Sequence, residues 1–187
     1  MRITGGKLSR RIIQTPKQGV RPTQERVREA VFAALGPALT GARVLDCFAG
    51  TGAMGLEAWS RGAAEVDWIE SDARTFALLQ TNVTTLCGPS AARHCHRADV
   101  WSWLQRPAVH PYDFILADPP YVAHSRDFDW NEWLRLVRAN GWLRRDGWVL
   151  LEERAGANWE PAPGWMTQRD KTYGRTRVRL LQWAGAE

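Results

Sequence analysis

Short apolar runs alternate with segments of helical spacing along most of the chain. The runs predict strands because they are rich in β-branched and aromatic residues and are bounded by turn-forming residues. They cover residues 42–48, 65–70, 91–98, 112–118 and 148–152, of which 91–98 is the weakest. Apolar residues at helical spacing predict helices over 54–59, 72–83, 100–104 and 130–139. The alternation predicts an α/β fold with right-handed crossovers and a doubly wound, mostly parallel sheet.

The N-terminal residues depart from this alternation. Extended runs at Arg2–Thr4 and Arg11–Ile13 surround a Gly-Gly-Lys turn, which is typical of a short hairpin or arm. Thr23 is the expected N-cap of the helix that follows, and a Gly-Pro pair ends that helix. We therefore expect a small basic arm or hairpin over residues 1–22 and a single larger domain over residues 23–187.

The last part of the chain is also different. Residues 165–169 and 176–181 are extended runs on either side of Tyr173 and Gly174. Two strands joined by a short turn that contains Gly predict an antiparallel hairpin. We expect this hairpin to close one edge of the sheet.

Composition limits the class of protein. The chain has 187 residues, of which 44% are hydrophobic and 24% charged, close to the average of globular proteins. No apolar run reaches the ~20 residues that span a membrane, and the first residues lack the apolar core of a signal peptide. The three cysteines are widely spaced and odd in number, unlike a secreted disulfide framework. We therefore expect a cytoplasmic protein without a membrane partner.

The positive charge is concentrated at the two ends of the chain. Residues 1–28 hold eight Lys or Arg and one acid, and residues 169–187 hold five Lys or Arg and two acids. Residues 29–168 between them hold twelve Lys or Arg and seventeen acids. An acidic body with basic ends suits a polyanionic partner held beside a site that is not itself basic.

A glycine-rich turn follows the first predicted strand. The segment Asp46–Gly55 contains G-x-G-x-x-G, whose glycines let a ligand approach the backbone at the start of a helix. Asp46 stands just before the turn, where a pyrophosphate would be repelled. A carboxylate there suits a cationic ligand instead, such as the amino group or the sulfonium of S-adenosylmethionine. A simple tight turn with a capping Asp is the alternative.

Acidic residues end the next two predicted strands. Glu70, followed by Ser71, lies about twenty residues after the glycine turn, where an acid commonly holds ribose hydroxyls. Asp99 has the equivalent position after the third strand and is a candidate for contact with an adenine amino group. Either acid also has a simpler role as the cap of the following helix, and for Asp72 capping is the favoured interpretation.

The sequence Asp118-Pro119-Pro120-Tyr121 follows the fourth predicted strand, at the edge where open α/β sheets bind ligands. Two prolines fix the backbone, so the Asp118 side chain and the Pro119 carbonyl point in set directions. Two acceptors side by side can take both hydrogens of an exocyclic amine and free its lone pair for methylation. Tyr121 offers a ring on which the base stacks. A plain turn with a surface Tyr is the alternative.

No metal site is predicted. His94, Cys95 and His96 look like ligands, but neighbouring residues of a strand point to opposite faces and no second cluster completes a tetrahedral site.

The chain resembles the bacterial RsmD family. The residues that carry the resemblance are Gly5-Gly6-Lys7, Arg21-Pro22-Thr23 with Arg26–Glu29, Leu45–Gly52, the Asp118–Tyr121 motif, and Lys171 with Tyr173-Gly174. The resemblance implies a Rossmann-like sheet of the class I methyltransferase type and methylation of the exocyclic N2 of a guanine in small-subunit (16S) ribosomal RNA. It also implies S-adenosylmethionine as cofactor. It assigns the base to Asp118, Pro119, Pro120 and Tyr121, and the cofactor to Asp46, Ala49, Gly50, Gly52, Glu70, Ser71, Asp99 and Asp118.

The basic ends are the predicted RNA contacts. The candidates for binding the RNA substrate are Arg10, Arg11, Arg21, Thr23, Arg26, Arg28 and Lys171. We expect a monomer that acts on ribosomal RNA within a small-subunit assembly particle. The alternatives are a DNA adenine or cytosine amino-methyltransferase, a non-catalytic RNA-binding assembly factor and, disfavoured by Asp46, an NAD-dependent oxidoreductase.

Overall fold

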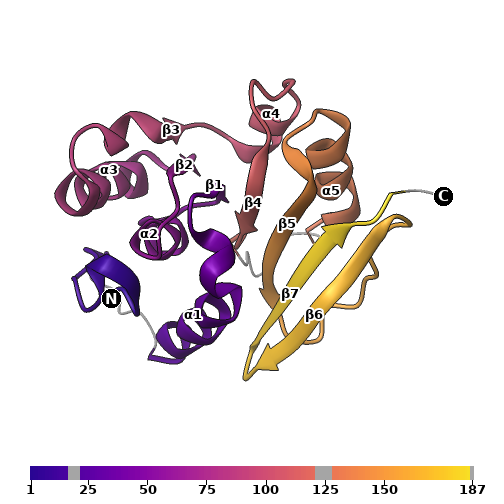
Figure 1. The fold of residues 1–187 in the computed structure, drawn as a ribbon, viewed down its shortest axis with the longest axis horizontal. Coiled ribbons are helices and arrows are strands. Elements are labelled where there is room, and N and C mark those ends of the chain that lie inside the picture. The colour runs from indigo at the N-terminus through magenta and orange to yellow at the C-terminus, as the bar shows by residue number, and fades with distance from the viewer. Residues whose placement is uncertain (17–21, 121–127, 186–187) are drawn as a thin grey trace.

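The structure is a computed structural model that describes residues 1–16, 22–120 and 128–185, without the side chains of 22–24 and 92–93. Its centre is a seven-stranded sheet with the order β3-β2-β1-β4-β5-β7-β6 (Figure 1). Five strands are parallel: β1 (Arg43–Cys47), β2 (Glu65–Glu70), β3 (Cys95–Arg97), β4 (Tyr112–Ala117) and β5 (Leu143–Arg154). The chain builds outward from β1 to β3 and then returns to β4 on the other side of β1. The predicted doubly wound, mostly parallel sheet is confirmed.

An antiparallel hairpin closes one edge of the sheet, as predicted. It consists of β6 (Trp165–Tyr173) and β7 (Thr176–Trp183), joined at Gly174, whose φ of 61° suits a residue without Cβ. The later strand, β7, lies inside and pairs with both β5 and β6. Among the described strands, the edge strand β6 pairs only with β7.

Helices cover both faces of the sheet and create two hydrophobic clusters. Alternate residues of each strand point to opposite faces, so Val44 packs in one cluster and Leu45 in the other. The first cluster includes residues of α1 (Pro22–Leu35), α2 (Ala53–Ser60) and α3 (Ala73–Cys87). The second includes residues of α4 (Val100–Leu104) and α5 (Trp130–Ala139). None of the helices that the structure describes is long and apolar enough to cross a membrane.

The N-terminal residues form a small hairpin that packs beside α1 and α2 (Figure 1). An antiparallel bridge joins Arg2 to Ile12, and a 3-10 turn, η1 (Gly6–Leu8), lies between them. The side chains of Ile3 and Ile13 are both 1% exposed and belong to the first hydrophobic cluster. The hairpin is therefore fastened to the body of the protein, and the division at residue 22 stays a prediction.

Three local predictions are wrong. Helix α1 begins at Pro22, so Thr23 lies inside its first turn and is not its N-cap; the fixed φ of proline suits the first helical position. Residues 91–94 form a 3-10 helix, η3 (Ala91–His94), and only Cys95–Arg97 form the third strand. Strand β5 begins well before residue 148: Leu143 already pairs with Tyr112 of β4, and a shift of register separates this pair from the regular pairing that starts at Trp148.

Candidate active site

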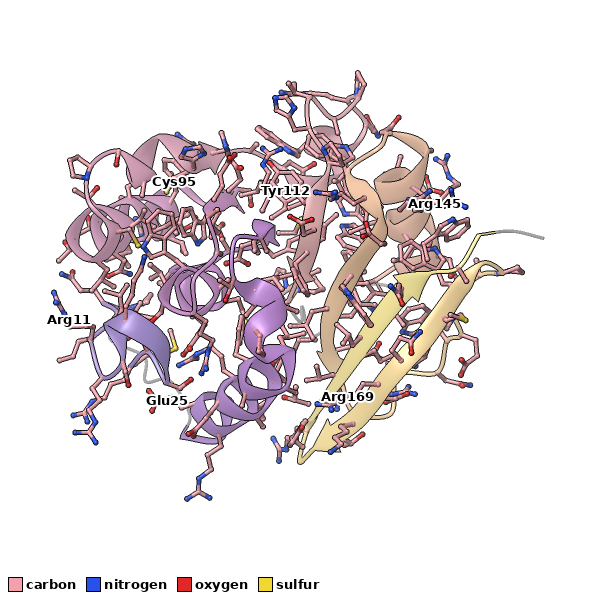
Figure 2. All side chains as sticks on the ribbon, viewed as in Figure 1. Arg11, Glu25, Cys95, Tyr112, Arg145 and Arg169 are labelled. Atoms are coloured by element: carbon pink, nitrogen blue, oxygen red, sulfur yellow. The ribbon has the colours of Figure 1, made fainter. Side chains whose placement is uncertain are left out.

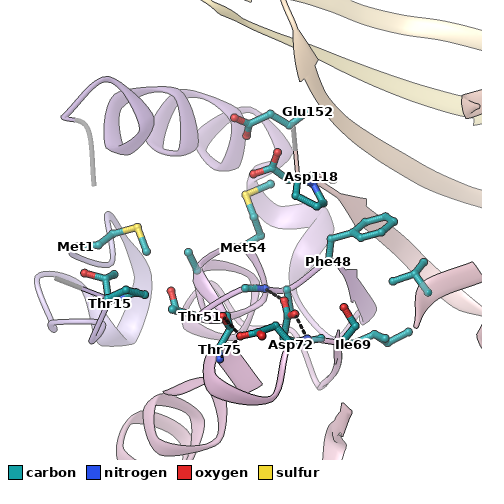
Figure 3. Close-up of a pocket in the computed structure, with 18 of the residues that line it drawn as sticks. Met1, Thr15, Phe48, Thr51, Met54, Ile69, Asp72, Thr75, Asp118 and Glu152 are labelled. Atoms are coloured by element: carbon teal, nitrogen blue, oxygen red, sulfur yellow. Dashed lines mark hydrogen bonds between the residues drawn. The ribbon is translucent and has the colours of Figure 1, made fainter. Parts of the chain in front are cut away.

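A cleft of about 530 Å³ opens at the carboxyl ends of the parallel strands. It lies where the strand order reverses between β1 and β4, the place at which open α/β sheets bind ligands. Figure 3 shows side chains from the β1–α2 turn, the β2–α3 turn, β5 and the N-terminal hairpin around it. Its size is in the range of sites for small molecules and cofactors.

The glycine turn forms the floor of the cleft. Gly50 has a φ of 56°, and no atom lies within 4 Å of the position where its Cβ would be. A side chain at this position would therefore project into the open cleft. Gly52 has a φ of 91°, and a Cβ there would lie 2.7 Å from Cδ1 of Leu79. A Cβ on Gly55 would lie 2.1 Å from Nε1 of Trp68, so this glycine lets α2 pack on the sheet.

Glu70 connects the floor to one wall. Its Oε2 accepts a hydrogen bond from the backbone N–H of Gly50 at 2.9 Å, and its Oε1 accepts one from Asp72 at 2.7 Å. Glu70 and Ser71 both line the cleft, as does Ala49. Asp72 caps α3 through the N–H of Thr75 at 2.8 Å, which confirms the capping interpretation.

Asp99 is both a helix cap and a residue of the cleft. Its carboxylate caps α4 by accepting hydrogen bonds from the N–H of Ser102 at 2.9 Å and from the hydroxyl at 3.0 Å. The same residue lines the cleft beside Val100. Capping is thus observed, and contact with a ligand stays a prediction.

Three carboxyl groups gather where β1, β4 and β5 end. Asp46 is 2% exposed and accepts a hydrogen bond from the Gly55 N–H at 2.7 Å. Burial, opposed by that hydrogen bond, raises the pKa of Asp46 to about 7. Burial together with the charges of Glu152 and Asp46 raises the pKa of Asp118 well above its usual value. A cationic ligand would stabilise the ionised forms of these groups.

The Asp-Pro-Pro segment follows β4 as predicted. Asp118 and Pro120 line the cleft, whereas Pro119 is buried beneath it. Tyr121 lies outside the described residues, so its stacking role stays a prediction. Asp46 and Gly52 are not among the residues that line the cleft; they support its floor from below.

An aromatic wall stands beside these residues. Phe48 lines the cleft, with a φ of 60°, and its ring meets that of Phe128 edge-on at 5.6 Å. Trp101 packs on Phe128 from the other side at 5.2 Å. Phe48, supported by these rings, offers an apolar surface next to the acidic end of the cleft, which is a suitable place for a planar base.

The predicted RNA contacts separate into two groups. Arg10, Arg11, Arg26 and Lys171 are exposed, and Figure 2 shows Arg11 at the outer edge of the N-terminal hairpin. Arg28 is only 5% exposed and lines the cleft. Arg21 and the side chain of Thr23 lie outside the described part of the chain.

The two histidines meet at one carboxylate. His94 Nδ1 lies 3.3 Å and His96 Nε2 lies 2.8 Å from Oδ1 of Asp67, whose Oδ2 accepts a hydrogen bond from Tyr112. Glu65 joins this cluster, and its carboxylate is also ion-paired with Arg43 at 2.8 Å. The polar groups of the cluster thus pair with one another, and the expected lack of a metal stays a prediction.

Sequence reasoning missed several residues of the cleft, among them Phe48, Met54 and Glu152. Phe48 was visible inside the glycine-turn motif. Glu152 could have been found from its position at the end of the fifth predicted strand, because parallel strands bring their carboxyl ends to one edge. Met54 lies inside the same motif, where its helical spacing indicated only an apolar face of the following helix.

The cleft has the features that a cationic nucleoside ligand requires. A carboxylate at the end of β2 suits ribose hydroxyls, and the open space above Gly50 allows close approach to the backbone. The carboxyl groups of Asp46, Asp118 and Glu152 supply negative charge at the other end. These residues fit S-adenosylmethionine, which joins a nucleoside to a sulfonium and an ammonium group.

Comparisons with known proteins agree with this geometry. A family model described as Conserved hypothetical protein 95 matches residues 1–182. The Escherichia coli (strain K12) protein named Ribosomal RNA small subunit methyltransferase D is 35% identical over 184 residues, covering 97% of this chain and 89% of the relative. The solved structure of yhhF from Escherichia coli has a TM-score of 0.82 and 33% identity, covering 99% of this chain and 98% of that one.

The fold extends to more distant proteins. A structure solved as a complex with SAH has a TM-score of 0.66 and 18% identity, covering 87% of this chain and 50% of that one. At that identity the likeness concerns the fold alone.

Proposed function

The chain belongs to the RsmD family of small-subunit ribosomal RNA methyltransferases, and we propose that it transfers a methyl group from S-adenosylmethionine to the exocyclic N2 amine of a guanine in 16S ribosomal RNA. The observation that carries this proposal is the position of Asp118 and Pro120 in the cleft, next to the glycine turn. The Asp-Pro-Pro-Tyr sequence suits an amine substrate, and the glycine turn suits the cofactor.

Each part of the cleft has a role in this reaction. Glu70 holds the ribose of the cofactor, and Ala49, Gly50, Ser71 and Asp99 surround the rest of its nucleoside. Asp46, which lies beneath the glycine turn, attracts the positive charge of the cofactor without contacting it. S-adenosylmethionine supplies the electrophilic methyl group.

Asp118 and the carbonyl of Pro119 bind the amine. By accepting hydrogen bonds from its two N–H groups, they favour a pyramidal nitrogen whose lone pair is free to attack. The attacking nitrogen must lose one proton once its bond to the methyl carbon has formed and the bond from that carbon to sulfur has broken. The raised pKa of Asp118 suits its carboxylate to receive that proton. Tyr121 stacks on the base, with Pro120 beside it.

The substrate is ribosomal RNA, held by the exposed basic residues of the two ends of the chain. A guanine in a duplex cannot reach the cleft, so the target base is unpaired or extruded. We propose that the protein acts as a monomer, without a metal, on RNA within a small-subunit assembly particle. Its place of action is then the cytoplasm, where those particles form.

The test is transfer of labelled methyl from S-adenosylmethionine to separate substrates: small-subunit particles, 16S RNA free of protein, and duplex DNA. Digestion to nucleosides and chromatography identify the product. We expect N2-methylguanosine from ribosomal RNA, with the particles as the best substrate. N6-methyladenine in DNA as the main product would overturn the proposal, and so would the absence of transfer to any RNA.

A further inference from the structure

Glu152 lies next to Asp118 at the carboxyl edge of the sheet. Ala117 of β4 is paired with Leu151 of β5, so Asp118 and Glu152 occupy the next positions on neighbouring strands, about 4.8 Å apart. Both line the same cleft, and Figure 3 shows their carboxyl groups side by side above Met54. The side chain of Glu152 can therefore contact the same ligand as the side chain of Asp118.

The carboxylate of Glu152 is not engaged in the described structure. The following residue, Glu153, points to the opposite face of the sheet, where Oε1 lies 3.0 Å from Nε of Arg179. Among the described residues, no donor forms a hydrogen bond with Glu152. Burial raises the pKa of Glu152, and the charge of nearby Arg28 opposes that rise. The hydrogen bonds of Arg28, however, go to Glu57, Arg2 and Met1.

We propose that Glu152 selects guanine by accepting a hydrogen bond from N1–H of the base, while Asp118 and the Pro119 carbonyl hold the N2 amine. This inference rests on the proposed function. It assigns the choice of base to Glu152 and the chemistry at the amine to Asp118, so two adjacent carboxylates have separate roles in one cleft.

The chemistry of the base edges supports this assignment. Guanine presents N1–H and the N2 amine as neighbouring donors on one edge. Adenine and cytosine present an unprotonated ring nitrogen, which is an acceptor, beside their amine. A carboxylate has only lone pairs to offer, so it attracts the ring N–H of guanine and repels the ring nitrogen of the other two bases. Repulsion of the wrong partner is an effective source of specificity.

The charges around Glu152 agree with an accepting role. The charge of Arg28 opposes the rise that burial causes in the pKa of Glu152. A donor such as N1–H of guanine favours the ionised carboxylate, which accepts hydrogen bonds and cannot donate them. Asp118 and Asp46 add negative charge on the same side, so the only favourable partner at this end of the cleft is a donor or a cation.

The experiment uses 2-aminopurine, which keeps the N2 amine but has an acceptor at ring position N1. The guanine that the protein methylates is first mapped, and RNA with 2-aminopurine at that position is then made by ligation and assembled into particles. Initial rates give kcat/KM for each RNA. We expect the unaltered protein to prefer guanine by about 100-fold or more, because a buried acceptor is otherwise unpaired.

The variant Glu152→Gln should lose this preference. Its amide can accept from N1–H of guanine or donate to N1 of 2-aminopurine, so the ratio should fall to about threefold or less. Glu152→Ala should lower kcat/KM for guanine and raise that for 2-aminopurine, because the repulsion of its ring N1 is removed. Glu29→Gln, which alters an exposed acid of α1, should keep the full preference. Thermal unfolding should match the unaltered protein in every variant. A change in cofactor affinity lowers the rate with both RNAs alike, so it leaves the ratio of their kcat/KM values unaffected.

The outcomes separate the two proposals. If the unaltered protein makes no N2-methylguanosine, the proposed function fails and this inference falls with it. If it does so but accepts 2-aminopurine equally well, the inference is wrong while the function stands, and no variant is needed to reach that result. The inference is equally overturned if Glu152→Gln is folded and active but keeps the full preference for guanine.

Discussion

Nε of Arg28 donates a hydrogen bond to Oε1 of Glu57 at 3.1 Å, and the two side chains are 5% and 0% exposed. The same carboxylate accepts a hydrogen bond from the N–H of Thr4 at 2.6 Å and pairs with Arg61 at 3.4 Å. Glu57 therefore joins the N-terminal hairpin to α1 and α2, and it holds Arg28 at the wall of the cleft.

Removing this shared acceptor should be costly. Glu57→Gln leaves the buried guanidinium of Arg28 without a counter-charge, so the free energy of unfolding should fall by about 3 kcal/mol. Chemical denaturation measures it. Glu29→Gln, on the exposed side of α1, is the control and should change the free energy by less than about 0.5 kcal/mol. A Glu57→Gln protein as stable as the control would show that the ion pair contributes nothing.

The raised pKa of Asp46 predicts how stability depends on pH. The folded protein keeps a proton on Asp46 up to a pKa of about 7, whereas an exposed Asp loses it near ~4. The folded state thus binds more protons between these values. The contribution of this group is full below pH ~4 and is lost as the pH rises through about 7. Denaturation of the unaltered protein and of Asp46→Asn across this range should show a smaller loss in the variant; the part that remains comes from other buried carboxyl groups such as Asp118.

Cofactor binding should have the opposite pH dependence. A cationic ligand favours the carboxylate form, so affinity for S-adenosylmethionine should rise about tenfold from pH 6 to pH 8 as Asp46 ionises, with release of a proton. Calorimetry in buffers of different ionisation enthalpy measures both the affinity and the number of protons released. Asp46→Asn should flatten the profile. Asp72→Asn is a suitable control, because the pKa of Asp72 is lowered by its hydrogen bonds to Thr75 and the group stays ionised throughout. An unchanged slope in Asp46→Asn would contradict the prediction.

Substitutions of Asp118 should affect turnover more than cofactor binding. Asp118→Ala removes an acceptor from the amine and should lower kcat by about 100-fold or more, while the dissociation constant of the cofactor changes less than about tenfold. Asp118→Asn keeps one acceptor and should be milder. Tyr121→Ala should raise KM through lost stacking, and Tyr121→Phe should be nearly silent. Wild-type rates in Asp118→Ala would exclude this site.

The salt dependence of RNA binding should show which of the exposed basic residues contact phosphates. If Lys171 contacts a phosphate, Lys171→Ala should reduce the slope of log affinity against log salt by about one unit. Filter binding of 16S RNA at several salt concentrations gives the slope. The control is Arg145→Ala, since Figure 2 places Arg145 beside α5, away from the end where Arg169 lies. Equal slopes for the two variants would show that Lys171 is not a phosphate contact.

The sequence predicted the strongly patterned elements well. The bounds of β2 and α5 agree with the structure because both are clearly delimited, β2 by polar ends and α5 by the capping Asp129. The length of the third strand was overestimated: it has only three residues. Its pairing with β2 is decided by tertiary contacts, which the local pattern does not carry. The first half of β5 was missed because Arg144, Arg145 and Asp146 are charged.

The candidate site was predictable only where a motif lay along one stretch of chain. The glycine turn and the Asp-Pro-Pro segment each carry their geometry locally. Glu152 and Arg28 reach the cleft through the strand order and the packing of α1, and neither is visible from spacing alone. Arg28 was predicted only as a candidate RNA contact; its burial depends on the ion pair with Glu57, which is 29 positions away.

The position of β7 between β5 and β6 has a consequence for synthesis on the ribosome. Strand β6 leaves the exit tunnel before β7, which is its partner in the sheet that the structure describes. Until Trp183 has been translated, both β6 and the free edge of β5 carry unpaired backbone groups, which is a state open to misassociation. Helices α1 to α5 and the parallel strands can assemble earlier, but the sheet is completed only after β7 has been translated. Ribosome-bound chains shortened before β7 should therefore be cut by protease within β6, and full-length released chains should resist.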